Sequence, residues 1–332
     1  MNALEMPNPL ESREAAPPLR KQCLSLLIDR QNGDGGWGFR AGQTSRVEPA
    51  CWALCALRGQ PQDSSVVVRA NRFLQTTQLR DGSWPASSQM KSGSWVTSLA
   101  CSVLRDSVEF RANVKAGLEW LCEDFPRDSS WWRRFLGRLR SGSASNSFGD
   151  TYRGWGWTPR TSSWVEPTAF ALMTLSEATP QLLPGNALRR RELAISLLYD
   201  RMCPGGGWNC GNPRVYGVDG DALVLATCWA LLALREAPEK PGRPLSIAWL
   251  EKESANIQTA GSLAVAKMTL ENYGMDLPKR KLSLEDFSAE ELAEEGTHVL
   301  AWVCMALDPA RPWPSFATRK LATAKNSHGN VQ

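Results

Sequence analysis

The sequence predicts an all-α fold in which about six helical hairpins close into a double ring, an α/α toroid. Three observations predict it: an apolar helical phrase that recurs along the chain, a more polar helix in front of most copies, and glycine–tryptophan turns between the two. The chain has 332 residues, 42% of them hydrophobic, enough to bury a large core. We expect one toroid domain over residues 17–310, with an insertion at 125–164 and tails at 1–16 and 311–332.

The recurring phrase is an apolar helix that ends in Ala-Leu or a close variant. The two clearest copies start with Glu-Pro and run from Glu48 to Leu57 and from Glu166 to Leu175. Weaker copies cover 97–104, 226–234, 259–270 and 300–307. Their terminal leucines are 36 to 71 residues apart, a spacing that suits one helical hairpin per repeat. We expect these helices to form the inner layer.

The second helix of each pair carries polar residues at helical spacing, which is typical of a half-solvated outer layer. The expected outer helices span 17–30, 64–78, 108–124, 187–202, 243–257 and 284–294. Each apolar inner helix must be covered on both flanks and on its outer face, so the pairs close into a ring. The inner helices then run parallel, and their N-termini open on one mouth.

Turns built on glycine and tryptophan lie between the helices, at 35–38, 81–84, 154–157 and 205–208. Glycine permits left-handed backbone at a helix end, and a buried tryptophan anchors the loop. Tryptophan is unusually abundant, with 15 residues against four tyrosines. We interpret the tryptophans of these turns as structural.

One stretch carries a more specific pattern, in which a glutamine at the end of an outer helix precedes Gly-x-Trp. Gln78 and Trp84 occupy these places in the sequence RFLQTTQLRDGSW, and Gln31 before Trp37 is a looser match. The pattern resembles the glutamine–tryptophan repeat of the squalene-hopene and oxidosqualene cyclases, whose superfamily includes the protein prenyltransferase β subunits. The resemblance runs from residue 17 to about residue 307. It implies the α/α toroid and an enzyme that handles isoprenoids.

Three polar residues occupy one position of the repeat, nine residues before the terminal leucine: Glu48, Glu166 and His298. We expect all three to point at the mouth and count them as candidate catalytic residues. A glutamate before proline is also an ordinary helix start, because proline suits the first turn and a carboxylate the positive end of the dipole. A lone histidine beside an apolar stripe can likewise be structural.

Two aspartates, Asp219 and Asp221, stand where a loop enters the most apolar inner helix. Triterpene cyclases use an Asp-x-Asp-Asp motif in such a place, and this chain matches it with Ala222 in the last position. The resemblance implies that Asp221 is the acid and that Asp219 tunes it. An apolar cavity and a second carboxylate would raise the pKa of the acid, and tryptophan faces would stabilise carbocations. The leading prediction is a squalene-type cyclase-like isomerase that needs no cofactor.

Two alternatives stay open. Prenyltransferase β subunits bind zinc through Asp-x-Cys and a distant histidine, and Asp219, Asp221 and His298 look similar, with Asp221 in place of the cysteine. That resemblance implies a divalent metal, zinc or magnesium, and allows a second subunit. The other alternative is a toroid without catalysis that binds a lipid or a protein, the two aspartates then capping a helix. Cys203 and Cys210 flank a glycine turn and form a further candidate metal pair.

Composition excludes other classes of function and indicates where the protein acts. A net charge of +4 is too small to require a nucleic-acid partner. The longest apolar run, 222–234, is short of the roughly 20 residues that cross a bilayer. The N-terminus has no export signal, so we expect a cytoplasmic protein. Four arginines among apolar residues at 131–140 predict a peripheral membrane contact or a cap over the cavity.

Overall fold

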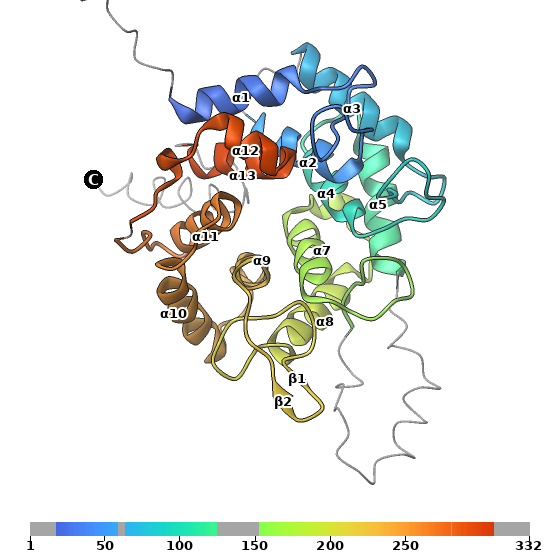
Figure 1. The fold of residues 1–332 in the computed structure, drawn as a ribbon. Coiled ribbons are helices and arrows are strands. Elements are labelled where there is room, and N and C mark those ends of the chain that lie inside the picture. The colour runs from blue at the N-terminus through green and yellow to red at the C-terminus, as the bar shows by residue number, and fades with distance from the viewer. Residues whose placement is uncertain (1–17, 59–63, 125–152, 280, 309–332) are drawn as a thin grey trace, which may run out of the picture.

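The computed structural model describes residues 18–58, 64–124, 153–279 and 281–308. In this part of the chain, twelve α-helices alternate between an outer and an inner layer (Figure 1). The inner helices are α2 (Val47–Ala56), α4 (Val96–Leu104), α7 (Val165–Glu177), α9 (Val224–Leu234), α11 (Ala260–Asn272) and α13 (Thr297–Ala306). The outer helices are α1 (Leu19–Asp29), α3 (Ser65–Thr77), α5 (Arg111–Glu123), α8 (Ala187–Asp200), α10 (Gly242–Ser254) and α12 (Ala289–Glu295).

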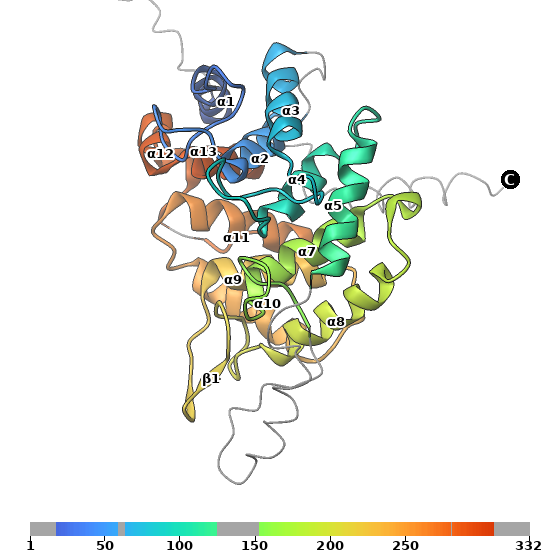
Figure 2. The ribbon, with the colours of Figure 1, turned by 90° about the vertical axis from the view of Figure 1, so that its right-hand side faces the viewer.

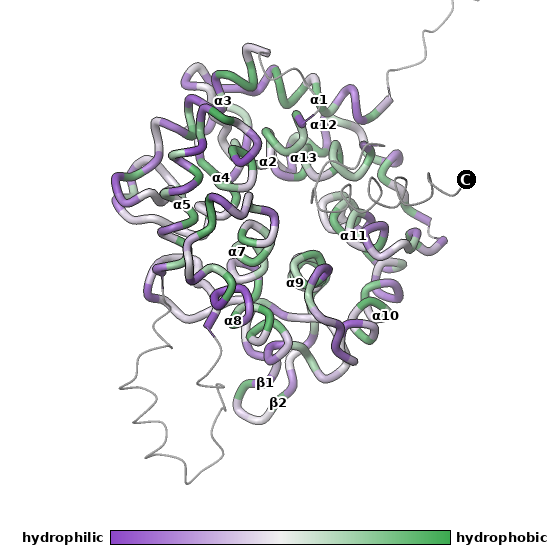
Figure 3. The backbone as a smooth tube through the Cα atoms, turned by 180° about the vertical axis from the view of Figure 1, so that it is seen from behind, coloured by the Kyte–Doolittle hydropathy of each residue, from purple (hydrophilic) through white to green (hydrophobic). Residues whose placement is uncertain are grey.

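The inner helices form a closed ring. Each packs against the next one along the chain, and α13 packs against α2 (Figures 1 and 2). The inner helices are apolar on nearly every side, which is why they are buried; in α9 every residue from Ala226 to Leu234 is buried. Hydropathy along the backbone shows the same division between the layers (Figure 3). The expected α/α toroid is confirmed.

The N-termini of the inner helices share one face, the mouth, because backbone hydrogen bonds tie them to neighbouring loops. The Thr297 amide of α13 donates to the carbonyl of Phe39, in the loop before α2, at 2.8 Å. The Val165 amide of α7 donates to Cys210, in the loop before α9, at 2.9 Å. These loops each join an outer helix to the next inner helix, so the starts of α13 and α2, and of α7 and α9, lie side by side.

The glycine–tryptophan turns fasten the two layers together. Trp37, Trp84, Trp155 and Trp208 are fully buried, and each indole Nε1 donates to a carbonyl of the preceding outer helix at 2.6–2.9 Å. Gln78 Nε2 donates to the carbonyls of Gly82 and Asn113 and thereby joins α3 to α5. Gln31 joins α1 to α3 through the carbonyl of Val66 at 2.8 Å. The structural interpretation of these turns is confirmed.

Short elements occupy the remaining loops. A two-stranded antiparallel hairpin, β1 (Arg214–Val215) and β2 (Val218–Asp219), projects from the loop between α8 and α9. Short 3₁₀ turns lie at Pro180–Leu182 and Leu284–Asp286. Across the described residues, no helix combines the length and apolar character that a membrane span needs. The expected tails and the 131–140 segment lie outside the described residues, as does the insertion up to residue 152.

Candidate functional site

The rim of the mouth is formed by one repeat position. Glu48, Glu166 and His298 lie in the first turns of α2, α7 and α13, and all three are half-buried. The corresponding positions of the other inner helices hold Trp95, Leu225 and Gly261. The structure therefore brings the three polar candidates to one rim, as the shared register predicts.

One helical turn further along, the same register places a layer of aromatic rings, which we call the aromatic floor: Trp52, Phe170, Trp229 and Trp302. Residues four apart lie on the same face of a helix, so each floor residue sits below a rim residue. The four side chains are buried, and each ring lies 5.1–5.8 Å from at least two others. The floor joins α2, α7, α9 and α13.

The rings of the aromatic floor meet across the axis of the toroid, where the sequence predicts an apolar cavity. Trp52 and Trp229 come from opposite members of the inner ring and stack with centroids 5.7 Å apart. Tryptophan rings are large enough to meet across the axis, so they close the ring one turn below the rim. The floor therefore lies one helical turn below the rim residues.

Glu48 is the acid whose ionisation is most changed by this environment. Burial raises the pKa of Glu48 to about 7, and an interaction with the indole of Trp52 opposes part of that rise. No lysine or arginine contributes to the shift. About half of the Glu48 side chains are therefore protonated at neutral pH, which is the state that a proton donor needs.

Glu166 lies on the other side of the mouth and is held by a thiol. Its Oε1 accepts a hydrogen bond from Cys210 Sγ at 3.6 Å, while its Oε2 is buried without a hydrogen-bond partner. Burial also raises the pKa of Glu166. Cys210 thus acts as a hydrogen-bond donor to the Glu166 carboxyl group.

His298 packs edge-on against two rings. Its ring centroid is 4.9 Å from that of Trp302, at an interplanar angle of 78°, and 6.2 Å from that of Phe39. Burial lowers the pKa of His298, so the imidazole is neutral at pH 7. Its Nδ1 is buried without a hydrogen-bond partner beside the backbone of Gly296.

The expectation that Asp219 and Asp221 lie in an apolar cavity is wrong. Both are exposed, and Asp219 belongs to the projecting hairpin, where its Oδ1 is 3.1 Å from Arg214 Nε. The Asp219 side chain is 51% accessible. Neither aspartate caps α9, which begins after Leu223 without a side-chain cap. The hairpin forms locally and takes Asp219 away from the helix entrance, whereas Asp221 lies two residues before Leu223 and is exposed there.

The proposed metal ligands are not brought together either. Within the described ranges, no group of three or more His, Cys, Asp or Glu side chains could hold a metal ion. Asp219 and Asp221 are exposed on their loop, whereas His298 is enclosed by rings of the mouth. The prediction that Asp219, Asp221 and His298 form a zinc or magnesium site is therefore wrong. Cys203 and Cys210 are both free thiols and belong to no group of three such ligands in the described ranges.

An apolar collar surrounds the mouth, and sequence reasoning missed it. Loops and helix starts on this face leave large apolar side chains partly exposed, and two of them contact the rim: Phe39 lies beside His298, and Trp157 packs on Trp95 with centroids 5.2 Å apart. The sequence does carry a signal for these rings. Trp95 lies nine residues before the terminal leucine of its repeat, and each floor residue lies five residues before the terminal leucine of its own repeat. The other collar residues are Trp164 and Leu223, which directly precede α7 and α9.

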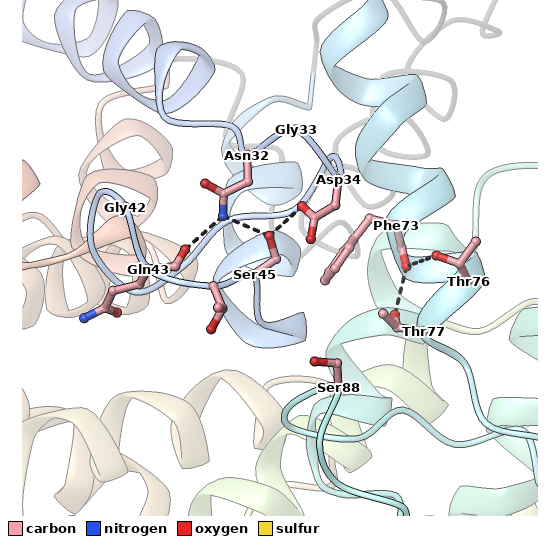
Figure 4. A pocket seen from close by; sticks show the side chains of 11 residues that line it. Asn32, Gly33, Asp34, Gly42, Gln43, Ser45, Phe73, Thr76, Thr77 and Ser88 are labelled. Atoms are coloured by element: carbon pink, nitrogen blue, oxygen red, sulfur yellow. Dashed lines mark hydrogen bonds between the residues drawn. The ribbon is translucent and has the colours of Figure 1, made fainter.

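A pocket of about 640 Å³ opens on the same face, between the loop before α2 and the end of α3 (Figure 4). Its polar groups are committed to one another: Ser45 Oγ donates to Asp34 Oδ1 at 2.6 Å, and Asn32 Nδ2 donates to Ser45 Oγ at 2.9 Å. These bonds hold the first glycine–tryptophan turn. The pocket is therefore explained by the architecture of the loop.

No protein-family model matches the sequence. Among curated proteins, the chain is similar to a drimenyl diphosphate synthase from Streptomyces showdoensis, with 27% identity over 271 residues. The match covers 68% of this chain and 48% of that protein. The chain thus spans about half the length of the curated relative it matches.

Among solved structures, the fold is similar to the endo-β-1,4-glucanase CMCax from Acetobacter xylinum, with a TM-score of 0.54 and 13% identity, over 88% of this chain and 99% of that one. It is also similar to a variant of the type II terpene cyclase MstE from Scytonema in complex with merosterolic acid A, with a TM-score of 0.50 and 13% identity, over 89% and 80% of the two chains. The resemblance to the terpenoid cyclase superfamily is confirmed, although a glucanase shares the toroid and the fold alone selects no reaction.

Proposed function

Because the chain is terpene cyclase-like in sequence and fold, we propose that its mouth binds an isoprenoid chain and that Glu48 protonates this chain to start cyclisation. The reaction class is that of a cyclase-like isomerase. Glu48 replaces Asp221 as the proposed acid, because a proton donor in this chemistry needs a dry site and Asp221 is exposed.

One observation carries the proposal: a carboxyl group whose pKa is about 7 lies one helical turn above a layer of aromatic rings. The floor rings are themselves buried, so they keep water away from the base of the mouth. The partly exposed rings of the collar give an apolar surface along which a hydrocarbon chain can be bound, and their faces attract a cation. Acid and cation-stabilising surface thus meet at one place.

The proposed first step is a proton transfer from the Glu48 carboxyl to a carbon–carbon double bond. The π electrons of that bond form the new C–H bond, the neighbouring carbon becomes a carbocation, and Glu48 is left as a carboxylate. A second double bond of the same chain then donates its π electrons to the cation and closes a ring. Loss of a proton from the last cation restores a double bond, so product and substrate are isomers.

The isoprenoid class is supported by the names of the relatives. The curated relative is a drimenyl diphosphate synthase, and MstE was solved with the product merosterolic acid A. The prenyltransferase alternative loses support, because the metal ligands that it needs are not assembled among the described residues. A second subunit and a membrane contact at 131–140 remain proposals without a supporting observation.

The test is incubation of the purified chain with squalene and with linear prenyl alcohols and diphosphates of C15 to C30, followed by gas chromatography and mass spectrometry. We expect a cyclic product of unchanged mass and at least a hundredfold lower rate in Glu48→Gln. Glu119→Gln, in a half-exposed side chain of α5, is the matched control and should keep full activity. Full activity in Glu48→Gln would exclude this acid. Retained lipid without turnover would identify the non-catalytic binder, and hydrolysis of carboxymethylcellulose would identify a glucanase.

A further inference from the structure

The geometry points to His298 as the catalytic base that removes the final proton, so that Glu48 and His298 form the acid and the base of one cycle. This inference rests on the proposed function. It goes beyond it by assigning the step that ends the reaction.

Glu48 and His298 occupy the same repeat position on neighbouring helices. Their helices, α2 and α13, are the neighbours whose contact closes the inner ring. Both residues occupy the same register, and the floor residues one turn below them, Trp52 and Trp302, lie 5.6 Å apart at an angle of 84°. A cation bound at the rim, above these two rings, would therefore lie between the two helices that carry Glu48 and His298.

His298 has the protonation state of a base. Burial alone lowers the pKa of its imidazole, and no charged group contributes to the shift. Nδ1 is enclosed beside Gly296, so Nε2 is the nitrogen left to meet a ligand. In the tautomer that carries hydrogen on Nδ1, Nε2 presents a lone pair to the mouth.

Glu166 is less suited to this step. It lies on α7, which is the member of the inner ring opposite α13, with two inner helices between them on each side. Its Oε1 already accepts the Cys210 thiol hydrogen bond. The residue therefore faces the part of the floor formed by Phe170, across the mouth from Trp302.

The cycle balances without another reagent. The electron pair of a C–H bond beside the cation becomes the π bond of the product, and the proton moves to Nε2 of His298. At that stage His298 is an imidazolium and Glu48 a carboxylate. Transfer of the Nε2 proton to Glu48, directly or through one water molecule, restores both residues. The products are the cyclic isomer and the original form of the protein.

The test compares product distributions of the full chain and its variants. His298→Gln keeps a polar side chain of similar size that cannot take up the proton. We expect the main product to shift from the cyclic alkene to a cyclic alcohol, because water captures the cation that the base no longer deprotonates. His328→Gln changes the other of the two histidines, in the tail, and should leave the products unchanged.

Chemical rescue makes the test independent of a general loss of structure. Adding imidazole to His298→Ala should restore the alkene, whereas it should not restore Glu48→Gln. Parent-like products in both His298 variants would overturn this inference while leaving Glu48 as the acid. An unfolded His298→Ala and an unfolded His298→Gln would also count against it, because they would make the residue structural. No cyclisation by the parent chain would overturn the proposed function itself.

Discussion

The indole rings of Trp52 and Trp229 stack across the axis of the toroid, with centroids 5.7 Å apart and planes inclined by 24°. Since α2 and α9 are opposite members of the inner ring, this contact joins two helices that are not neighbours in the ring. The stack is buried and therefore supports the ring from inside, at the base of the mouth.

Trp52→Ala should destabilise the fold by about 3 to 5 kcal/mol, because it removes a fully buried ring that contacts three others and leaves a cavity. Trp157→Ala is the control, since this collar ring is 36% exposed, and should cost under about 1 kcal/mol. Urea unfolding followed by far-ultraviolet circular dichroism measures both. A similar loss of unfolding free energy in the two variants would mean that the aromatic floor does not stabilise the ring of inner helices.

Glu48 makes stability depend on pH in a defined direction. Its pKa is about 7 when folded against a usual value of 4.5, so between these pH values the unfolded chain loses its proton first and stability falls as pH rises. Glu48→Gln removes that loss of roughly 3 kcal/mol. The variant should gain stability relative to the parent between pH 4.5 and pH 8. A constant difference over this range, measured by urea unfolding, would contradict the raised pKa.

The same ionisation predicts how activity responds to pH. The protonated form of Glu48 is the proposed donor, so the rate should fall about tenfold per pH unit well above pH 7. Initial rates of cyclisation from pH 5 to pH 9 measure it. A rate that rises through this range would show that the reactive form of Glu48 is the carboxylate.

Gly82 is required for two reasons that substitution can separate. Its φ is +87°, and an added Cβ would lie 2.6 Å from the Ala116 carbonyl oxygen of α5. Gly42 has a φ of +73° but open space around it. Gly42→Ala should cost about 1 kcal/mol for backbone strain alone, and Gly82→Ala at least twice as much. Equal losses in thermal unfolding would show that α5 can move away.

A buried ion pair joins α4 and α7 at the face opposite the mouth. Arg105 and Glu177 are in contact, with side chains only 6% and 1% accessible. Glu177→Gln should cost about 3 kcal/mol, because it removes the buried partner of the guanidinium and leaves the exposed Asp106, 3.6 Å from Nε, as the carboxylate in contact with it. Replacing both residues with methionine should recover part of that loss. A double variant less stable than Glu177→Gln would show that the pair is worth more than its desolvation costs.

The register of the repeats made part of the site predictable. Glu48, Glu166 and His298 share one position in helices that run parallel, so their common rim follows from the spacing of the terminal leucines. The same reasoning failed for Asp219 and Asp221. Val215 and Val218 pair across a tight turn at Tyr216 and Gly217, both of which have positive φ, and this local hairpin takes Asp219 out to solvent.

The alternation of apolar and half-polar helices was sufficient to determine the toroid, its two layers and the face on which the inner helices begin. Those features depend on patterns within single hairpins, which neighbouring residues establish. Only the tertiary structure decided that rings from opposite helices close the axis, that Glu48 holds a proton near neutral pH and that His298 stays neutral. Each of these depends on how far water is excluded, and that is set by contacts between residues more than a hundred positions apart.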